Sequence, residues 1–427
     1  MDIQIFPTEN ATQTIQKAID ELFSIGGGRV VIHKGEYQIS SLLLRSDVTL
    51  YLKAGACLKG SRLPDDYDIS DRLSPESGEN YTDAQNCPIA HTGRGWIKPS
   101  GSTNPFSRWS RAMIKAYRAK NIAIIGEQGA VFDGQNCYDE KGEEGFRGPH
   151  FINFHECEGI HLRGYTLQNS SNWGHALFTS SHILCEELTI LAGHDGIDFL
   201  SCDDVTIRCC TIRSGDDAIA GFDCKNVLVE DCFFSTACNA MRIGGEVTVR
   251  RCRIVGSGEY GHRVSMTLEE KKAGKIAYAD NARHNMLSAF EYYSDFRYAI
   301  RSRSDIVIED CEIENCDKLI SYCFTLPKHQ WCKNEPLHSL KLQGVRAKNV
   351  GLGCRLYAPD DHPLTVECKN CTFEINNEEF GIAQNTSLSF ENVRFTSNPP
   401  LYFTVSRNTD VRFVNSDTME LKKSECI

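Results

Sequence analysis

The chain has 427 residues, and its 57 acidic residues outnumber the 46 basic ones, which gives a formal net charge of −11 at pH 7. Such a negative balance disfavours nucleic acids and anionic membranes as partners. No apolar run is long enough to cross a bilayer and the first residues lack the apolar core of a signal peptide, so we expect a cytoplasmic protein.

The first predicted element is a helix near the N-terminus. Between Thr12 and Phe23 the apolar residues recur at helical spacing, with Asn10 or Thr12 as the N-cap, and three glycines at 26–28 end the pattern. An amphipathic helix of this kind suits the open end of a repeat protein, whose core would otherwise face water. We therefore predict that residues 1–45 form an N-terminal cap.

A repeat can be followed through most of the remaining chain. Each unit has apolar residues at an anchor position and at two, five and seven positions after it, as in Val205, Ile207, Cys210 and Ile212. Short alternating runs are typical of β-strands, and a fixed period without an internal helix indicates a parallel β-solenoid. The predicted fold is therefore all-β, a parallel β-helix, right-handed because of the usual crossover handedness. The anchors are Ile160, Ile183, Val205, Val227, Val247, Ile306, Leu340, Leu364, Leu388 and Val411.

The repeat also predicts how the chain is organised. A solenoid is one elongated unit, so we predict a single β-helix domain over residues 1–427 rather than the two or three domains that this length suggests. The stretch 62–110 is polar and rich in Pro, Gly and Ser, which predicts a long loop. The 59-residue step from Val247 to Ile306 predicts a projecting loop or short helix. The predicted segments are the cap at 1–45, turns that carry the site at 46–255, an excursion at 256–304 and C-terminal turns at 305–427.

Twenty cysteines would suit a disulfide framework, but their positions argue against one. Cys210, Cys232, Cys252 and Cys311 each lie five residues after an anchor, which predicts an inward ladder where cysteine acts as a small apolar residue. With no export signal, we expect free thiols in a reducing compartment. A zinc site at the Cys-x-x-Cys pair 368–371 is the alternative, but a second pair is missing. We predict no metal and no cofactor.

Two acidic clusters fall one repeat apart. The segment 194–198 reads HDGID and the segment 214–219 reads SGDDAI. Because stacked strands lie about 4.8 Å apart, Asp195, Asp216 and Asp217 should converge on one patch. Crowded carboxylates repel one another, so one should keep its proton near neutral pH. The patch therefore predicts general acid–base hydrolysis.

Further motifs accompany the clusters in a recognisable order. They are TQTIQKAIDEL near the N-terminus, GAVFDGQ at 129–135, RGPHFINF at 147–154, LQNSSNWGHAL at 167–177, and HDGIDFLSCDDVTI followed by SGDDAIAG. Over about residues 10–255 the chain resembles glycoside hydrolase family 28, the polygalacturonase-like enzymes of the pectin-lyase-type β-helix. The resemblance implies an inverting hydrolase in which Asp216 protonates the leaving oxygen. It implies that Asp217 and Asp195 activate the water.

The chain departs from that family in three places. The family's Asn-Thr-Asp triplet reads Gly-His-Asp at 193–195, and its histidine beside the acid falls on Asn239. The family's Arg-Ile-Lys motif, which binds the substrate carboxylate, has no clear counterpart. Arg242 is the predicted replacement, because its planar fork matches a carboxylate. The alternative for Arg242 is a salt bridge with Glu246.

The other candidate residues come from neighbouring positions. His194 is predicted to bind sugar hydroxyls or to tune the base, and Trp173 and His175 lie one turn earlier, where the family has a substrate-facing stretch. A tryptophan packed in the core is equally common. Asp198 is predicted to be structural and to point away from Asp195, because strand side chains alternate. The predicted substrate-binding residues are thus His194, Asn239, Arg242, His175, Trp173 and Glu246.

The preferred interpretation is an inverting, exo-acting glycoside hydrolase for imported α-linked oligosaccharides, including uronate-containing pectin fragments. A polysaccharide lyase or epimerase on the same fold is one alternative, although it would need a strong base such as lysine or arginine. A fructan-processing transferase and a non-catalytic carbohydrate-binding solenoid are the others. The partner is in each case an oligosaccharide, and the sequence leaves a homo-oligomer open.

Overall fold

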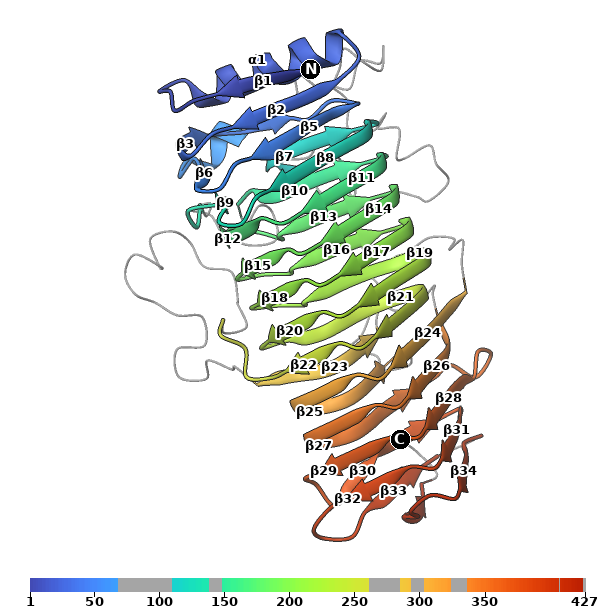
Figure 1. Cartoon of the computed structure of the whole chain (residues 1–427). Helices are drawn as coiled ribbons and strands as arrows, with labels where there is room; N and C mark the ends of the chain where they lie inside the picture. Colours follow the sequence, from blue (N-terminus) through green and yellow to red (C-terminus); the bar gives the residue numbers. More distant parts are fainter. Residues whose placement is uncertain are drawn as a thin grey trace.

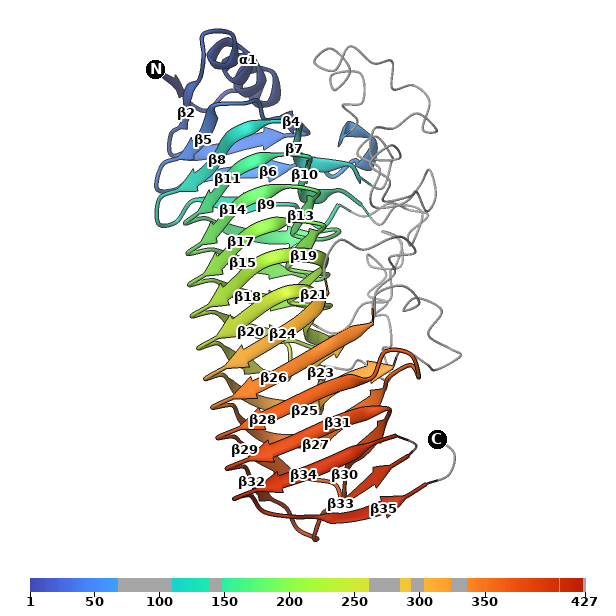
Figure 2. The ribbon, with the colours of Figure 1, turned by 90° about the vertical axis from the view of Figure 1, so that its right-hand side faces the viewer.

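The chain winds into a coil of stacked parallel strands (Figure 1). The computed structural model describes residues 1–67, 110–137, 148–260, 285–292, 303–323, 336–406 and 408–424. In the view turned by 90°, the strands follow one another along the axis from α1 at one end to β35 at the other (Figure 2). The predicted right-handed parallel β-helix is confirmed. No helix in these described ranges is long and apolar enough to cross a membrane.

Three parallel sheets form the faces of the coil, and all three contribute residues to the core. Sheet A consists of β1 (Asp2–Ile5), β2 (Gly28–Ile32), β5 (Val48–Leu52), β8 (Lys120–Gly126), β11 (Glu158–Arg163), β14 (Ser181–Glu186), β17 (Asp203–Arg208), β24 (Ser304–Glu309), β26 (Leu337–Gln343), β28 (Leu364–Lys369), β31 (Thr386–Glu391) and β34 (Asp410–Val414), with the C-terminal halves of β19 (Ile219–Glu230) and β21 (Asn239–Arg250). Sheet B consists of β3 (Gly35–Ile39), β6 (Ala56–Gly60), β9 (Val131–Asp133), β12 (Thr166–Ser170), β15 (Thr189–Ala192), β18 (Thr211–Ser214), β20 (Phe233–Thr236), β22 (Arg253–Val255), β29 (Thr372–Ile375) and β32 (Arg394–Thr396), with the N-terminal halves of β25 (Glu312–Cys323) and β27 (Arg346–Tyr357).

Sheet C is the face that carries the acidic clusters. It consists of β4 (Leu42–Leu43), β7 (Ala112–Tyr117), β10 (His150–His155), β13 (His175–Phe178), β16 (Ile197–Leu200), β23 (Met286–Tyr292), β30 (Glu379–Gln384), β33 (Tyr402–Val405) and β35 (Glu420–Lys423), with the N-terminal halves of β19 and β21 and the C-terminal halves of β25 and β27. Each strand pairs in parallel with the equivalent strand one turn away, so equivalent side chains stack on one another along the axis.

Helix α1 (Ala11–Ser24) closes the N-terminal end of the core. Its apolar side, which includes Ile15, Ile19 and Leu22, is buried against the first strands, while the opposite side faces solvent. Asn10 is the N-cap residue, as predicted, although its side chain makes no capping hydrogen bond. The helix therefore has the place and the amphipathic character that the cap prediction requires.

The predicted anchor residues form a ladder through sheet A, with one correction. Ile183, Val205 and Val227 are paired in register on successive turns, as expected. Leu340, however, pairs with Val366 and not with Leu364, which pairs with Thr386. The predicted anchor of that turn was therefore two residues too early. Because strand side chains alternate, Leu364 and Val366 both lie on the buried face of β28. The apolar pattern of the sequence therefore cannot tell which of the two is the anchor.

The cysteine prediction agrees with the described part of the chain. The 17 cysteines described there are free, and most are buried. Cys210, Cys232, Cys252 and Cys311 stack inward with their backbone or thiol groups in contact from turn to turn. Cys371 lies five residues after Val366, the corrected anchor, and is buried in the same way. The Cys-x-x-Cys pair is thus part of the core.

The predicted excursion needs a correction. Met286–Tyr292 is strand β23 of sheet C, and it pairs with β21 on one side and with β25 on the other. The range 256–304 thus contains a strand of the coil, which the sequence did not predict. Residues 261–284 and 293–302, which make up most of that predicted excursion, lie outside the described residues, as do 68–109 of the predicted long loop. The described start of that loop contains a 3-10 turn, η1 (Pro64–Tyr67).

Candidate active site

The acidic clusters meet at the corner that leads into sheet C. Gly196 donates a backbone hydrogen bond to the carbonyl of Asp217 at 2.9 Å, and Ala218 donates one to the carbonyl of Asn239 at 3.0 Å. Asp195, Asp217 and Asn239 therefore occupy equivalent positions on three successive turns. The prediction that the clusters stack on neighbouring turns agrees with this geometry.

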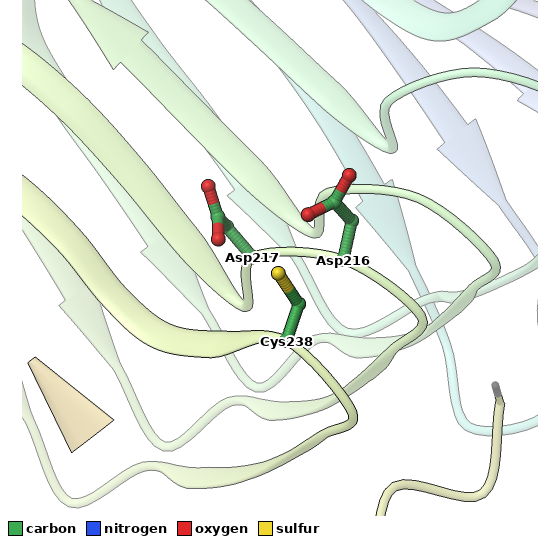
Figure 3. A group of neighbouring side chains, drawn as sticks. All are labelled: Asp216, Asp217 and Cys238. Carbon is green, nitrogen blue, oxygen red and sulfur yellow. The ribbon is translucent and has the colours of Figure 1, made fainter. Parts of the chain in front are cut away.

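Asp216 and Asp217 lie side by side on one turn, and the thiol of Cys238 on the next turn points toward both carboxylates (Figure 3). The donor atoms of these three side chains lie within 4.8 Å of one another. Asp216 is partly exposed, whereas Asp217 is buried. The carbonyl of Asp216 accepts hydrogen bonds from the hydroxyls of Ser214 and Thr236, which hold this corner in place. One carboxyl of the pair can thus reach a substrate, and the other is removed from water.

Arg242 on β21 contacts two of the three predicted catalytic carboxylates. Its Nε donates to Oδ2 of Asp217, and its Nη2 lies 3.7 Å from Oδ2 of Asp195. The guanidinium also lies over the ring of Phe222, 5.4 Å from the centroid. Glu246 is exposed and pairs in register with Asp305 in sheet A, outside this corner. Arg242 is therefore paired with Asp217 and Asp195, and the alternative of a salt bridge with Glu246 does not fit the geometry.

Asn239 occupies the position that the resemblance gives to the family's histidine. Its Nδ2 donates to Oδ1 of Asp217 at 2.8 Å. Both oxygens of Asp217 are thus hydrogen bonded, one by Asn239 and one by Arg242. Burial raises the pKa of Asp217, and these two donors oppose that rise. Asn239 and Arg242 thus favour the ionised form of Asp217, the form that a general base requires.

Asp195 is in a different electrostatic position. Burial raises its pKa well above the usual value, and the negative charges of Asp198, Asp216 and Asp217 raise it further. Arg242 opposes the rise from a distance. A carboxyl in this position holds a proton at a pH where an exposed aspartate would have lost it.

Asp198 belongs to the site, and the prediction that it points away from Asp195 was wrong. Asp198 is buried on β16, and its pKa is raised well above the usual value, first by burial and then by the charge of Asp217. It also interacts directly with the Asp195 carboxyl. The alternation argument failed because Asp195 lies in the corner before Ile197, where β16 begins, and not on the strand itself. The HDGID spacing is the sequence signal for Asp198, but the alternation of strand side chains does not apply across the corner before Ile197.

Glu291 is a second residue that the sequence did not place in the site. It lies on β23, is buried, and accepts a hydrogen bond from Ser288 at 2.8 Å. Burial raises its pKa, Lys318 opposes that rise, and the charge of Asp217 adds to it. In the sequence, Glu291 is only an acidic residue inside the predicted excursion, where no strand was expected.

The other candidates are distributed around this corner. His194 is buried beside Asp195, while Trp173 is partly buried and packs against the core. His175 lies inside the coil, in register with the core residue Ile197, and its Nε2 is 2.7 Å from the hydroxyl of Tyr165. Burial lowers the pKa of His175 to about 3, so the ring is neutral. The structure thus buries His194, which precedes Asp195 in the chain, and places His175 in the core, away from a substrate-facing surface.

Among the described residues, Asp216, Asp217 and Cys238 are close enough together to offer a metal ion three donor atoms. The guanidinium of Arg242 already provides positive charge at Asp217, and burial raises the pKa of the Cys238 thiol well above its usual value. A neutral thiol is a poor metal ligand, because the thiolate is the form that coordinates. These residues therefore do not fit a metal site well, and acid–base chemistry by the carboxyls requires none.

The fold and the site together define a parallel β-helix with a buried cluster of carboxyls at one corner. Residues 98–280 match the family model described as Glycosyl hydrolases family 28. A probable polygalacturonase of Vitis vinifera is 28% identical over 221 residues, which cover 49% of this chain and 40% of that protein. An exo-poly-alpha-D-galacturonosidase of Dickeya chrysanthemi is 23% identical over 233 residues, which cover 49% of this chain and 38% of that protein. The resemblance to family 28 is thereby confirmed.

A solved structure extends the likeness to the whole fold. The family 28 exopolygalacturonase of Yersinia enterocolitica superposes with a TM-score of 0.61 over 96% of this chain and 76% of that chain, at 17% sequence identity. At this identity the likeness shows the β-helix fold. The family match contains both acidic clusters, whereas the matched stretch spans less than half the length of either curated relative.

Proposed function

We propose that the protein is an inverting glycoside hydrolase that cleaves α-linked, pectin-type oligosaccharides. The family match and the curated relatives support a glycoside hydrolase. The observation that carries the proposal is the carboxyl arrangement at the corner of sheet C. It combines the partly exposed Asp216 with the buried Asp217 and Asp195, and Arg242 bridges the two buried groups.

In the proposed mechanism each carboxyl has a separate task. Asp216, which can reach the substrate, donates its proton to the glycosidic oxygen while the bond from that oxygen to the anomeric carbon breaks. A water molecule attacks the anomeric carbon from the opposite face and gives its proton to the base formed by Asp217 and Asp195. Arg242 and Asn239 keep Asp217 ionised and oriented for this step.

The substrate's own charge is a further part of the proposal. Arg242, the predicted partner of a uronate carboxylate, is already bound by Asp217 and Asp195. On the turns that follow, Lys318 and Arg355 are half-buried and form no ion pair with another described residue. We propose that these two cations take a uronate unit that lies beyond the cleavage point. Exo action is proposed on the name of the Dickeya relative alone.

The cytoplasmic location and the action on imported fragments are also proposals. The 17 free cysteines of the described residues support a reducing compartment, because cysteines in oxidising compartments are usually paired. Subcellular fractionation with an antibody against the protein tests this location. Recovery with the periplasmic or secreted fraction would refute it.

The function is tested by hydrolysis of short α- and β-linked oligosaccharides, uronic and neutral, with wild type, Asp216→Asn and the exposed-site control Asp317→Asn. Proton NMR would follow the anomer of the first product. We expect wild type and the control to release an inverted sugar, and Asp216→Asn to lose at least about 100-fold in kcat. An unsaturated product that absorbs in the ultraviolet would indicate a lyase instead. Binding without turnover by all three proteins would indicate a carbohydrate-binding solenoid.

A further inference from the structure

Asp198 is buried without the partners that a buried charge needs. Its relative exposure is 1%, and apart from the contact with the Asp195 carboxyl its oxygens have no hydrogen-bond partner among the described residues. A buried carboxylate that receives no hydrogen bond is strongly unfavourable. The site therefore contains a buried carboxyl whose ionised form is favoured only by the charge of Arg242 and by the contact with Asp195.

The two side chains in register with Asp198 along sheet C supply no hydrogen-bond donor. It is in register with Ala176 on β13 and with Ala220 on β19, and both have only a methyl group to present. The charged groups that face Asp198 come from three other places: Asp195 from the corner before β16, Asp216 and Asp217 from the corner before β19, and Arg242 from β21. Three of these four groups are carboxyls, and the single cation is bound to Asp217.

The contact between Asp198 and Asp195 explains how the site tolerates this burial. Two ionised carboxylates in contact repel each other, whereas a single proton between them replaces the repulsion with a hydrogen bond. Burial raises the pKa of each of the two carboxyls well above its usual value. The two groups therefore behave as a pair that binds its first proton tightly.

We propose that Asp195 and Asp198 share one proton, and that through this proton Asp198 acts as a positioning residue, which holds the Asp195 carboxyl toward the attacking water. The inference rests on the proposed function for its catalytic part. Before the reaction the pair holds one proton. When Asp195 accepts a proton from the water, the shared proton shifts to Asp198, and the pair then holds two. Asp216 has lost one proton to the leaving oxygen, and exchange with solvent after product release restores both.

The shared proton is tested without substrate, by thermal unfolding of wild type, Asp198→Asn and the exposed control Asp317→Asn between about pH 4 and pH 8. An unfolded aspartate loses its proton near pH 3.9, whereas the folded pair retains it to higher pH. The pair should therefore contribute less to the stability of wild type as the pH rises through this range. The amide of Asp198→Asn cannot ionise, so its melting temperature should exceed that of wild type by a margin that grows with pH. A margin that is the same at every pH, or one that the Asp317→Asn control reproduces, would overturn the shared proton.

The positioning role is tested by activity on whichever oligosaccharide wild type hydrolyses. An asparagine can still donate to Asp195, whereas an alanine cannot. We expect Asp198→Ala to lower kcat by about 100-fold with KM nearly unchanged, and Asp198→Asn to keep kcat within about tenfold of wild type. Equal losses in the two variants, or none in Asp198→Ala, would refute this role. If wild type itself hydrolyses nothing, the proposed function fails, but the unfolding experiment still decides whether the proton is shared.

Discussion

The Nε of Arg242 donates a hydrogen bond to Oδ2 of Asp217, and the two side chains are 12% and 3% exposed. The pair is thus nearly removed from water. A buried ion pair contributes little net stability, but loss of one partner leaves an uncompensated charge. The arginine that was predicted to bind the substrate therefore contacts the proposed base Asp217 and favours its ionised form.

Arg242→Ala should abolish measurable hydrolysis and destabilise the protein by about 3–5 kcal/mol, because it leaves Asp217 buried without its cation. Arg242→Lys should recover only part of the activity, since an ammonium cannot reach Asp217 and Asp195 with one planar group. Steady-state kinetics and urea unfolding measure both effects. Arg355→Ala, three turns further along sheet C, is the matched control for the unfolding measurement only, because Arg355 is itself a proposed substrate contact. Full activity in Arg242→Ala would contradict the role of the ion pair.

Asn239→Ala should shift the acidic limb of the pH–rate profile to higher pH. The hydrogen bond from Asn239 to Oδ1 of Asp217, at 2.8 Å, favours the ionised carboxylate. The substitution removes this hydrogen bond. The folded-state pKa of Asp217 should therefore rise, and the base should lose its charge at a higher pH than in wild type. The activity at neutral pH should fall by about tenfold. Asn226→Ala is the control, because its amide bonds to Asp204 at a different corner. An unchanged acidic limb would show that Asn239 does not tune the base.

The fold could be predicted because the repeat determines it redundantly. The anchor Leu364 was placed two residues too early, and yet the strand, its sheet and its buried face were correct. Met286–Tyr292 was missed as a strand because a single turn there requires 59 residues between the anchors Val247 and Ile306, which are in fact paired directly. A period can predict the next turn only when the connection has its usual length.

The site was predicted less completely, because a site depends on where side chains point. Asp195 and Asp217 stack on neighbouring turns as expected, because their stacking follows from the period of the repeat alone. The position of Asp198 depends on where the corner ends and β16 begins, a boundary that sequence patterns locate only within a few residues. The interaction of Arg242 with Asp217 depends on which of two partners its side chain reaches. The apolar pattern of the sequence contains no information on that choice.

Thiol chemistry should distinguish the core from the surface. Cys209 is exposed, whereas burial and the nearby charges of Asp216 and Asp217 raise the pKa of Cys238 well above its usual value. Only the thiolate reacts rapidly, so iodoacetamide at pH 7.5 should label Cys209 and leave Cys238 unmodified. Peptide mass spectrometry measures both sites, with Cys209→Ser as the control. Because the described cysteines are free, reduction should leave the melting temperature unchanged. Rapid labelling of Cys238 would show that the thiol is more acidic than its burial implies.

Asp305 should show the opposite pH dependence to Asp198. Burial alone would raise its pKa, but hydrogen bonds from Arg303, Ser339 and His338 prevail and lower it to about 2. The folded protein therefore binds this proton more weakly than the unfolded chain. The stabilisation by Asp305 should be complete above about pH 4–5 and should disappear as the pH falls toward 2.

Asp305→Asn should accordingly cost about 1–2 kcal/mol at pH 7, a value reduced for the partial exposure of the side chain, and almost nothing near pH 2. Urea unfolding at several pH values measures this difference. Asp317→Asn, at an exposed position, serves as the control and should be neutral throughout. A cost that did not change with pH would mean that Asp305 stabilises the fold through its hydrogen bonds regardless of its charge. A cost that decreased as the pH fell, as expected, would assign the effect to the charge of Asp305.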